Sequence, residues 1–368
     1  MTFTDEQLAR LWLQCAPMGA WNRLNALKEE WGSALGVWQH FTSAFYEQLG
    51  HETFSLLADS RAVRCGPVIR ALEGLNAQAV FYGEPGYPAS LLPIENPPDV
   101  LFVRGALPPP DTPAIAIVGS RRATRYGFAQ ARRIARELAE RGVTVVSGLA
   151  RGIDAASHLG ALEGKGRTIA VLGSGVGNLY PPENKELAQR ILQEGGAIVS
   201  ELAPDSPPFP YHFPVRNRII SGLSAGVLLI EAQQKSGTHF TVDYALNQGR
   251  EVFALPGNVD APGSELPLML LRDGAQICTC AGDIFSRMGW EAKPPEQSSF
   301  LSDPQQDEDP DDPALPILKA LALEEKTLEE LIEETGKSAG ELSAQLTLLE
   351  ISGKIERRAG RAYALAPS

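Results

Sequence analysis

The pattern of apolar positions divides the chain into three parts. Over residues 1–75, apolar side chains recur at helical spacing and predict a small bundle of short helices. Over residues 113–285, short apolar runs alternate with amphipathic stretches. Such runs are typical of strands buried on both faces of a parallel sheet, and the amphipathic stretches are typical of helices. The middle part is therefore predicted to be a doubly wound α/β sheet.

The predicted strands share one feature: glycine, hydroxyl or charged residues follow most of them directly. The runs are Ile115–Val118, Val143–Val146, Thr168–Leu172, Ala197–Ser200, Gly226–Ile230 and Glu251–Leu255, with a short last strand at Ala275–Cys278 and an edge strand at Val100–Val103. In sheets of this kind, ligands bind outside the carboxyl ends of the strands. We therefore expect the functional site at that edge.

The turn after the first of these strands has the composition of a phosphate site. It reads Gly119, Ser120, Arg121, Arg122, and a helix is predicted to follow from about Tyr126. Glycine lets a ligand approach the backbone closely, and the start of a helix offers free N–H groups and the positive end of its dipole. The guanidinium forks match phosphate oxygens. A tight turn with two solvated arginines is the simpler alternative.

Two further segments extend this candidate site. Arg216 and Arg218 stand near the start of a predicted helix, where both could face an anion. The backbone amides and hydroxyls of Lys235–Thr238 form a plausible anion nest before the next helix. The alternative for the two arginines is a structural ion pair with Glu201 or Glu231, because ion-pair networks also gather charge near a cleft.

Composition narrows the class of protein. A chain of 368 residues is expected to hold two or three domains. The net charge of −12 argues against an overall basic nucleic-acid binder, although acidic residues concentrate in 291–313. The four cysteines lack zinc or C-x-x-C spacing, and His158, His212 and His239 are not spaced as metal ligands. No apolar run or leader pattern indicates a membrane or an export route, so we expect a cytoplasmic protein without metal or cofactor.

The last part of the chain has its own pattern. Residues 289–313, rich in proline, glutamine and acid, are predicted to be a disordered linker. Residues 314–368 are predicted to be a winged helix, with two capped helices and a two-stranded wing. That fold often binds DNA through its last helix, but few basic residues occur there, so protein contact is as well supported as weak DNA contact through the wing. The caps are Thr327 with Glu330 and Ser338 with Glu341, and the wing arginines are Arg357, Arg358 and Arg361.

Five segments, in this order, resemble the DprA/Smf family, the DNA-processing proteins of natural transformation. They are GSRRATRYG, SGLARGIDAASHLGAL, GNLYPPENKEL, FPVRNRIISGLSAGVLLIEA and SGTHFTVDYALNQGREVFALPG. The resemblance covers about residues 80–285. It implies an extended Rossmann-like α/β sheet with an N-terminal helical, SAM-like domain (1–78) and a C-terminal winged helix (314–368), the sheet and its helices spanning 79–288. It further implies a binding protein, not an enzyme, that protects incoming single-stranded DNA, loads the RecA recombinase onto it and dimerises through the α/β domain.

The resemblance also implies which residues contact DNA. Pro182 stands where many relatives carry a lysine, and Lys185 is the candidate to replace that contact. Nearby apolar or aromatic groups are expected to take the bases. The predicted DNA-binding residues are Gly119, Ser120, Arg121, Arg122, Gly148, Ala150, Arg151, Lys185, Arg216, Asn217, Arg218, Lys235, Ser236, Gly237 and Thr238.

Three alternatives remain. A nucleotide-processing enzyme of the phosphoribohydrolase type would carry P-G-G-x-G-T-x-x-E, but aligning Gly237 and Thr238 with its G-T places Thr241 at the catalytic glutamate. A dinucleotide enzyme would carry G-x-G-x-x-G in the first turn, which this chain lacks. An adaptor that contacts only protein would not need so many arginines at the edge. The apolar run Leu266–Leu271 is either core or the dimer surface.

Overall fold

The computed structural model describes residues 2–290, 315–321, 326–351, 355–357 and 362–365. The chain forms two compact units, residues 1–296 and 297–368. The linker predicted over 289–313 lies almost entirely outside the described residues and stays a prediction.

In the first unit the described strands form a nine-stranded sheet in the order β1-β2-β6-β5-β4-β3-β7-β8-β9. The strands from β6 to β9 in this order are parallel, and β1 and β2 extend one edge in antiparallel pairing. The predicted doubly wound sheet is confirmed. The strand that we predicted at its edge is β2, and it is not the edge itself, because β1, which was not predicted, lies outside it. The strands are β1 (Ala77–Phe81), β2 (Val100–Gly105), β3 (Ala114–Val118), β4 (Thr144–Ser147), β5 (Thr168–Val171), β6 (Ala197–Ser200), β7 (Gly226–Leu229), β8 (Glu251–Ala254) and β9 (Gln276–Ile277).

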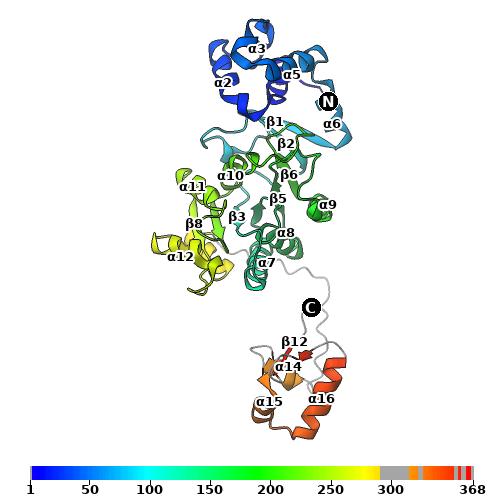
Figure 1. The fold of residues 1–368 in the computed structure, drawn as a ribbon, viewed down its shortest axis with the longest axis vertical. Coiled ribbons are helices and arrows are strands. Elements are labelled where there is room, and N and C mark those ends of the chain that lie inside the picture. The colour runs from blue at the N-terminus through cyan, green and yellow to red at the C-terminus, as the bar shows by residue number, and fades with distance from the viewer. Residues whose placement is uncertain (1, 291–314, 322–325, 352–354, 358–361, 366–368) are drawn as a thin grey trace. The chain divides into compact units, whose positions relative to one another are not determined.

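Helices cover both faces of this sheet (Figure 1). Alternate residues of β3 point to opposite faces, so that Ile115 packs with the helices of one layer and Ala116 with those of the other. The helix predicted from about Tyr126 is α7, and its buried stripe contains Ala131, Ile134 and Leu138. One layer holds α7 (Arg125–Ala139), α8 (Ile153–Glu163) and α13 (Ala281–Met288), with α9 (Lys185–Gln193) further along; the other holds α10 (His212–Gly222), α11 (His239–Asn247) and α12 (Glu265–Arg272).

The chain reverses its direction of winding at β3. It continues from β3 through α7 to β4 on one side, while β7 pairs with the other side of β3. The ends of β3 and β7 are joined directly, because the amide of Ser120 donates to the carbonyl of Glu231 at 2.7 Å. This is the topological switch point at which open α/β sheets bind ligands.

The N-terminal helices pack against the β1–β2 edge and share one core with it. Trp12 is fully buried, and its indole nitrogen donates to the carbonyl of Leu57 at 2.6 Å. The same hydrophobic cluster includes Phe102 of β2. The helices are α1 (Asp5–Gln14), α2 (Trp21–Glu30), α3 (Ala34–His40), α4 (Phe45–Leu49), α5 (His51–Ala62) and α6 (Gly66–Gly74).

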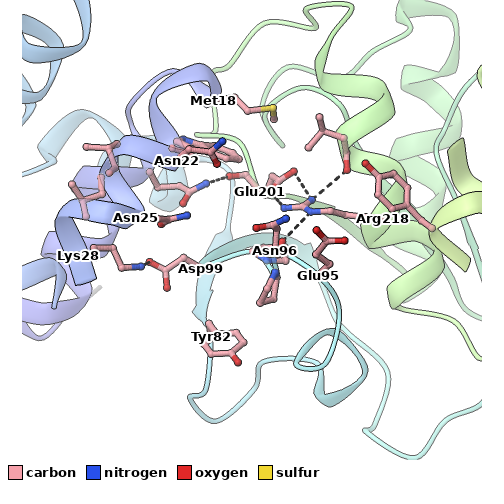
Figure 2. Close-up of a pocket in the computed structure, with 18 residues that line it drawn as sticks. Met18, Asn22, Asn25, Lys28, Tyr82, Glu95, Asn96, Asp99, Glu201 and Arg218 are labelled. Atoms are coloured by element: carbon pink, nitrogen blue, oxygen red, sulfur yellow. Dashed lines mark hydrogen bonds and ion pairs between the residues drawn. The ribbon is translucent and has the colours of Figure 1, made fainter. Parts of the chain in front are cut away.

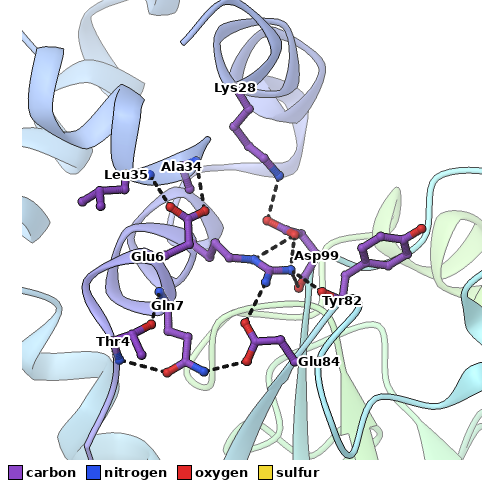
Figure 3. A network of polar contacts seen from close by, with 10 residues as sticks. Thr4, Glu6, Gln7, Lys28, Ala34, Leu35, Tyr82, Glu84 and Asp99 are labelled. Carbon is purple, nitrogen blue, oxygen red and sulfur yellow. Dashed lines mark hydrogen bonds and ion pairs between the residues drawn. The ribbon is translucent and has the colours of Figure 1, made fainter. Parts of the chain in front are cut away.

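A polar network fastens these helices to the sheet (Figure 3). The guanidinium of Arg10 on α1 bonds to both Glu84 and Asp99, and Lys28 on α2 lies 2.8 Å from the second oxygen of Asp99. Burial alone would raise the pKa of Asp99, but the hydrogen bonds and charges of Arg10 and Lys28 lower it overall. The carboxylate is therefore held ionised between α1, α2 and the β1–β2 edge.

The second unit is the predicted winged helix. Its core includes Leu331, Leu342 and Leu346, and both predicted capping boxes are present. The wing strands β11 (Ile355–Arg357) and β12 (Ala362–Leu365) pair antiparallel, and β10 (Lys326–Thr327) adds a third strand. The helices are α14 (Leu315–Leu321), α15 (Leu328–Thr335) and α16 (Ala339–Ile351).

Candidate nucleic-acid interface

The turn after β3 is shaped by close contact with its neighbours. A Cβ at Gly119 would lie 2.7 Å from the side chain of Ile153 and 2.8 Å from the carbonyl oxygen of Glu231, so only glycine fits there. Ser120 follows and is half-buried, and the side chains of Arg121 and Arg122 after it are exposed. Within the described part of the chain, neither guanidinium has a carboxylate partner. That of Arg121 lies 5.4 Å from the ring centre of Phe213.

The start of α7 is occupied by the protein's own carboxylate. Glu231 is buried and accepts hydrogen bonds from the backbone N–H of Thr124 at 2.9 Å and from its hydroxyl. Gly127, in the first turn, leaves room for this carboxylate, since a Cβ there would lie 2.3 Å from it. The prediction that the free N–H groups of this helix hold a phosphate is wrong, because Glu231 fills that place. That an anion binds the turn itself and its two arginine side chains stays a prediction.

Arg216 joins the ends of two strands. It lies in the second turn of α10, not at its start, and its guanidinium is buried and donates to the carbonyls of Gly148 and Val171. Burial lowers its pKa to about 10, with Asp154 raising it and Arg121 lowering it further. The prediction that Arg216 stands at the helix start and faces an anion held there is therefore wrong. Its position instead fixes the loops after β4 and β5.

The loop after β4 is held by the same arrangement. Asp154 is buried and accepts from the backbone N–H groups of Gly148 at 3.1 Å and Ala150 at 3.3 Å. Burial raises the pKa of this carboxyl, and Arg216 opposes that effect. Asn217, next to Arg216, accepts a hydrogen bond from its Nε at 3.1 Å. These contacts determine the shape of the loop.

Arg218 forms a structural ion pair with Glu201, the alternative to anion binding that the sequence left open. Its two terminal nitrogens bond to the carboxylate of Glu201 at 2.8 and 2.5 Å, and its Nε donates to the carbonyl of Asn96. Both side chains of the pair are less than one-tenth exposed. They line a pocket of about 850 Å³ between α2, the segment before β2, and α10 (Figure 2). The prediction that Arg218 faces an anion at the edge is wrong.

One other predicted segment meets the turn after β3. The hydroxyl of Thr238 donates to the carbonyl of Gly119 at 3.4 Å, which places Lys235–Thr238 beside it. Gly237 has open space around it, and the buried hydroxyl of Ser236 has no partner among the described residues. The segment is thus in place for an anion, and its binding of one stays a prediction.

The loop before α9 lies against the loop after β4. The side-chain amide of Asn184 donates to the carbonyls of Leu149 and Ala150. Arg151 is exposed and pairs with Glu183 at 2.6 Å, an exposed pair of the kind that contributes little stability. Lys185 is exposed at the first position of α9. Lys185 therefore directly follows a residue that contacts the loop after β4. Its contact with DNA stays a prediction.

Aromatic groups are expected at the site from the family resemblance, but the sequence pattern does not say which ones. The structure identifies Phe213, beneath Arg121 and 5.7 Å from the ring of Tyr180. Phe209 and Tyr211 precede it on the same segment and stack on one another. The signal was available, because the sequence FPYHF stands between a predicted strand and a predicted helix.

The described residues offer no group of three His, Cys, Asp or Glu side chains that could hold a metal ion. The buried ring of His158 lies with Nδ1 2.7 Å from the hydroxyl of Thr168, which supports a packing role. Within the described ranges, no helix has the length and apolar character that crossing a membrane requires.

The fold is a Rossmann-like sheet followed by a winged helix, and two arginines at its switch point have no carboxylate partner among the described residues. These features define a two-domain protein with a candidate anion-binding site. Residues 78–289 match the family described as DNA recombination-mediator protein A, and residues 302–361 match the DprA winged helix domain. The chain belongs to the DprA/Smf family, as its sequence segments indicated.

Individual relatives agree with this assignment. The chain is 43% identical over 276 residues to Protein Smf of Escherichia coli (strain K12), covering 73% of this chain and 72% of that protein. It is 42% identical over 203 residues to DNA processing protein DprA of Bacillus subtilis (strain 168), covering 55% and 68%. Two solved structures are similar. The X-ray structure of DNA processing protein A from Streptococcus pneumoniae has a TM-score of 0.61 at 30% identity and covers 78% of this chain and 98% of that one. The protein from Helicobacter pylori, described with a unique single-stranded DNA binding mode, has a TM-score of 0.54 at 28% identity and covers 60% and 98%.

Proposed function

We propose that this protein binds single-stranded DNA at the carboxyl edge of its sheet, with Arg121 as the central phosphate contact. The observation that carries the proposal is the pair of exposed guanidinium groups, Arg121 and Arg122, which no described carboxylate neutralises. The guanidinium of Arg121 also lies over the ring of Phe213. The binding mode described for the Helicobacter pylori relative supports the same ligand class. Arginine forks bind phosphate oxygens, and an aromatic face accepts an unstacked base.

The buried groups of the edge have a supporting part in this proposal. Arg216 and Asp154 hold the loop after β4, and Glu231 holds the start of α7. Because these charges are already satisfied within the protein, they keep the exposed arginines in place without competing for phosphate. The enzyme alternative gains no support, since Thr241, at the position of the catalytic glutamate, is buried in α11.

The test is Arg121→Ala, measured by salt titration of binding to matched single- and double-stranded oligonucleotides. We expect single-strand binding to weaken by about 1.5–3 kcal/mol, the range for a hydrogen bond to a charged group. The loss should be similar for every base sequence, because phosphate contacts carry no sequence information. The salt slope should shrink by somewhat less than one unit for each phosphate contact removed.

Arg132→Ala is the matched control. Arg132 lies on α7 away from the turn, in an exposed pair with Glu163 at 2.6 Å, so its loss should leave binding unchanged. A folded Arg121→Ala protein that binds single strands normally would overturn the proposal.

The wider role that we propose follows from the family. The protein protects incoming single-stranded DNA in the cytoplasm, loads RecA onto it and acts as a homodimer through the α/β domain. The description of the family as a recombination mediator supports this role. A RecA strand-exchange assay on DNA coated with single-strand-binding protein tests it. Stimulation by this protein, lost in Arg121→Ala, is the expected result, and an absence of stimulation would contradict the loading function.

A further inference from the structure

Exposed aromatic side chains gather at the carboxyl edge of the sheet. They lie in the segments that follow β3, β5, β6 and β7, where the proposed DNA contacts also lie. Single exposed apolar residues are normal on a protein surface, but a cluster marks a binding surface. The members are Tyr126, Tyr180, Phe209, Tyr211 and Phe240.

Phe209 and Tyr211 stand out within this cluster. Their rings stack with centres 5.6 Å apart and planes 7° apart, yet the residues remain 45% and 54% exposed. Both rings also contact the buried ring of His212, at 5.4 and 4.5 Å, with their planes nearly perpendicular to it. The pair is therefore anchored on one side and open to solvent on the other.

The backbone around the pair is restrained. Prolines at 207, 208 and 210 fix φ on both sides of Phe209, and the amide of His212 donates to the carbonyl of Phe209 at 3.0 Å. A surface whose side chains are already ordered loses little conformational entropy when a ligand binds. The pair is thus organised before any ligand arrives.

The pair is next to the proposed phosphate contact. Phe213, two residues after Tyr211, packs on Gly173 at the end of β5, where a Cβ would lie 2.8 Å from its ring. Arg121 lies over that same ring. His212, whose ring contacts both Phe209 and Tyr211, directly precedes Phe213 in the chain. We therefore expect a DNA strand with a phosphate on Arg121 to bring a nearby base to this pair.

We propose that Phe209 and Tyr211 form a stacking platform for a nucleobase, adjacent to the phosphate bound by Arg121. This proposal rests on the proposed function and adds a base-binding subsite to it. A single strand of DNA is the occupant that fits, because it supplies both phosphates for the unpaired arginines and flat π faces for the rings. The platform accepts every base, since stacking does not depend on base identity.

The test compares two probes, a 20-nucleotide oligothymidine and an abasic oligonucleotide of equal length and charge. The full-length double variant F209A/Y211A should bind oligothymidine at least about tenfold more weakly, within the range for loss of base stacking. Its affinity for the abasic strand should equal that of the unaltered protein. Tyr211→Phe keeps the ring and should keep the affinity, whereas Tyr211→Leu keeps apolar bulk and should lose part of it.

The control variant is Tyr46→Ala, because Tyr46 is 44% exposed on α4 and belongs to a different surface. It should bind both probes normally. Circular dichroism and thermal unfolding show whether each variant is folded. If the double variant does not fold, the single Tyr211 variants are used for the test instead.

The outcomes separate this proposal from the one it rests on. If the unaltered protein binds neither probe, the proposed function fails. If it binds both and the folded F209A/Y211A variant keeps its preference for oligothymidine, the platform is overturned while DNA binding stands. The platform is also overturned if affinity falls equally for both probes, or if only self-association or RecA stimulation is lost, since the rings would then serve the phosphate site or a protein partner.

Discussion

At the scale of single residues, carboxylates decide which arginines of the edge are available. Glu201 binds both terminal nitrogens of Arg218, whereas Arg121 and Arg122 meet no carboxylate in the part of the chain that the structure describes. A guanidinium already paired and buried would have to give up those bonds before binding phosphate. Burial and pairing, not the number of arginines, therefore define the interface.

Arg218→Met tests this assignment. Removing one partner of a buried pair leaves the other charge uncompensated, so we expect the free energy of unfolding to fall by about 3–5 kcal/mol. Urea denaturation measures the loss, and Arg132→Met, which breaks an exposed pair, should cost no more than about 1 kcal/mol. The double variant with Glu201→Gln should recover part of the stability. A double variant that loses the sum of the two single effects would contradict the pairing.

His158 makes stability depend on pH. Burial, with a smaller effect of Arg216, lowers its pKa to about 3, while the unfolded chain binds a proton near pH 6.5. Between these values the unfolded state binds more protons, so the free energy of unfolding falls as the pH falls. His158→Gln should reduce this slope by up to about 1.4 kcal/mol per pH unit between pH 6 and 4. If the free energies of unfolding of the variant and the parent protein change with pH by the same amount over that range, the prediction is wrong. The control is His51→Gln, because His51 is exposed.

At the scale of elements, the start of α7 shows how a local rule is reversed by its surroundings. Replacing glycine by alanine inside a helix normally stabilises it by up to about 1 kcal/mol. At Gly127 a Cβ would meet the Glu231 carboxylate at 2.3 Å. Gly127→Ala should therefore lower the melting temperature by displacing that carboxylate from Thr124. Gly74→Ala on α6, where nothing lies within 4 Å, should leave it unchanged or raise it; equal shifts in both variants would contradict this explanation.

The sequence predicts elements better than it predicts their polar partners. The strands of the α/β sheet follow from apolar runs, and α7 from its stripe, because those patterns reflect burial along one continuous segment. The strand β1 is not predicted from the sequence, because its pairing with Val100–Gly105 depends on residues beyond the intervening prolines. The carboxylate at the start of α7 is not predicted for the same reason, since Glu231 is more than a hundred positions from Thr124. The pairing of Arg218 with Glu201 could be stated as an alternative but not chosen, because it depends on where the fold places α10 relative to the residue that follows β6.

At the scale of the whole molecule, the question is what covers the outermost strand of the sheet, on the side away from β1. This outermost strand is β9, and Ile277 on it is 57% exposed. The neighbouring helix α12 buries Leu266 and Leu270 in the core, while Leu268, Met269 and Leu271 are only half-buried. Leu266 and Leu270 of this apolar run are thus core, and Met269 and Leu271 pack against that core while keeping part of their surface accessible. An unpaired edge with apolar neighbours is a surface that favours association.

We therefore expect a homodimer in solution through β9 and α12, and Ile277→Lys should shift it toward monomer. A lysine on each copy would bring like charge and a desolvation cost into the contact. Sedimentation velocity at micromolar concentration measures the change. Val259→Lys is the control, because Val259 is 76% exposed in the loop before α12 and should leave the dimer intact. A parent protein that sediments only as monomer at this concentration removes the dimer, whereas a dimer that persists in Ile277→Lys places the interface elsewhere on the molecule.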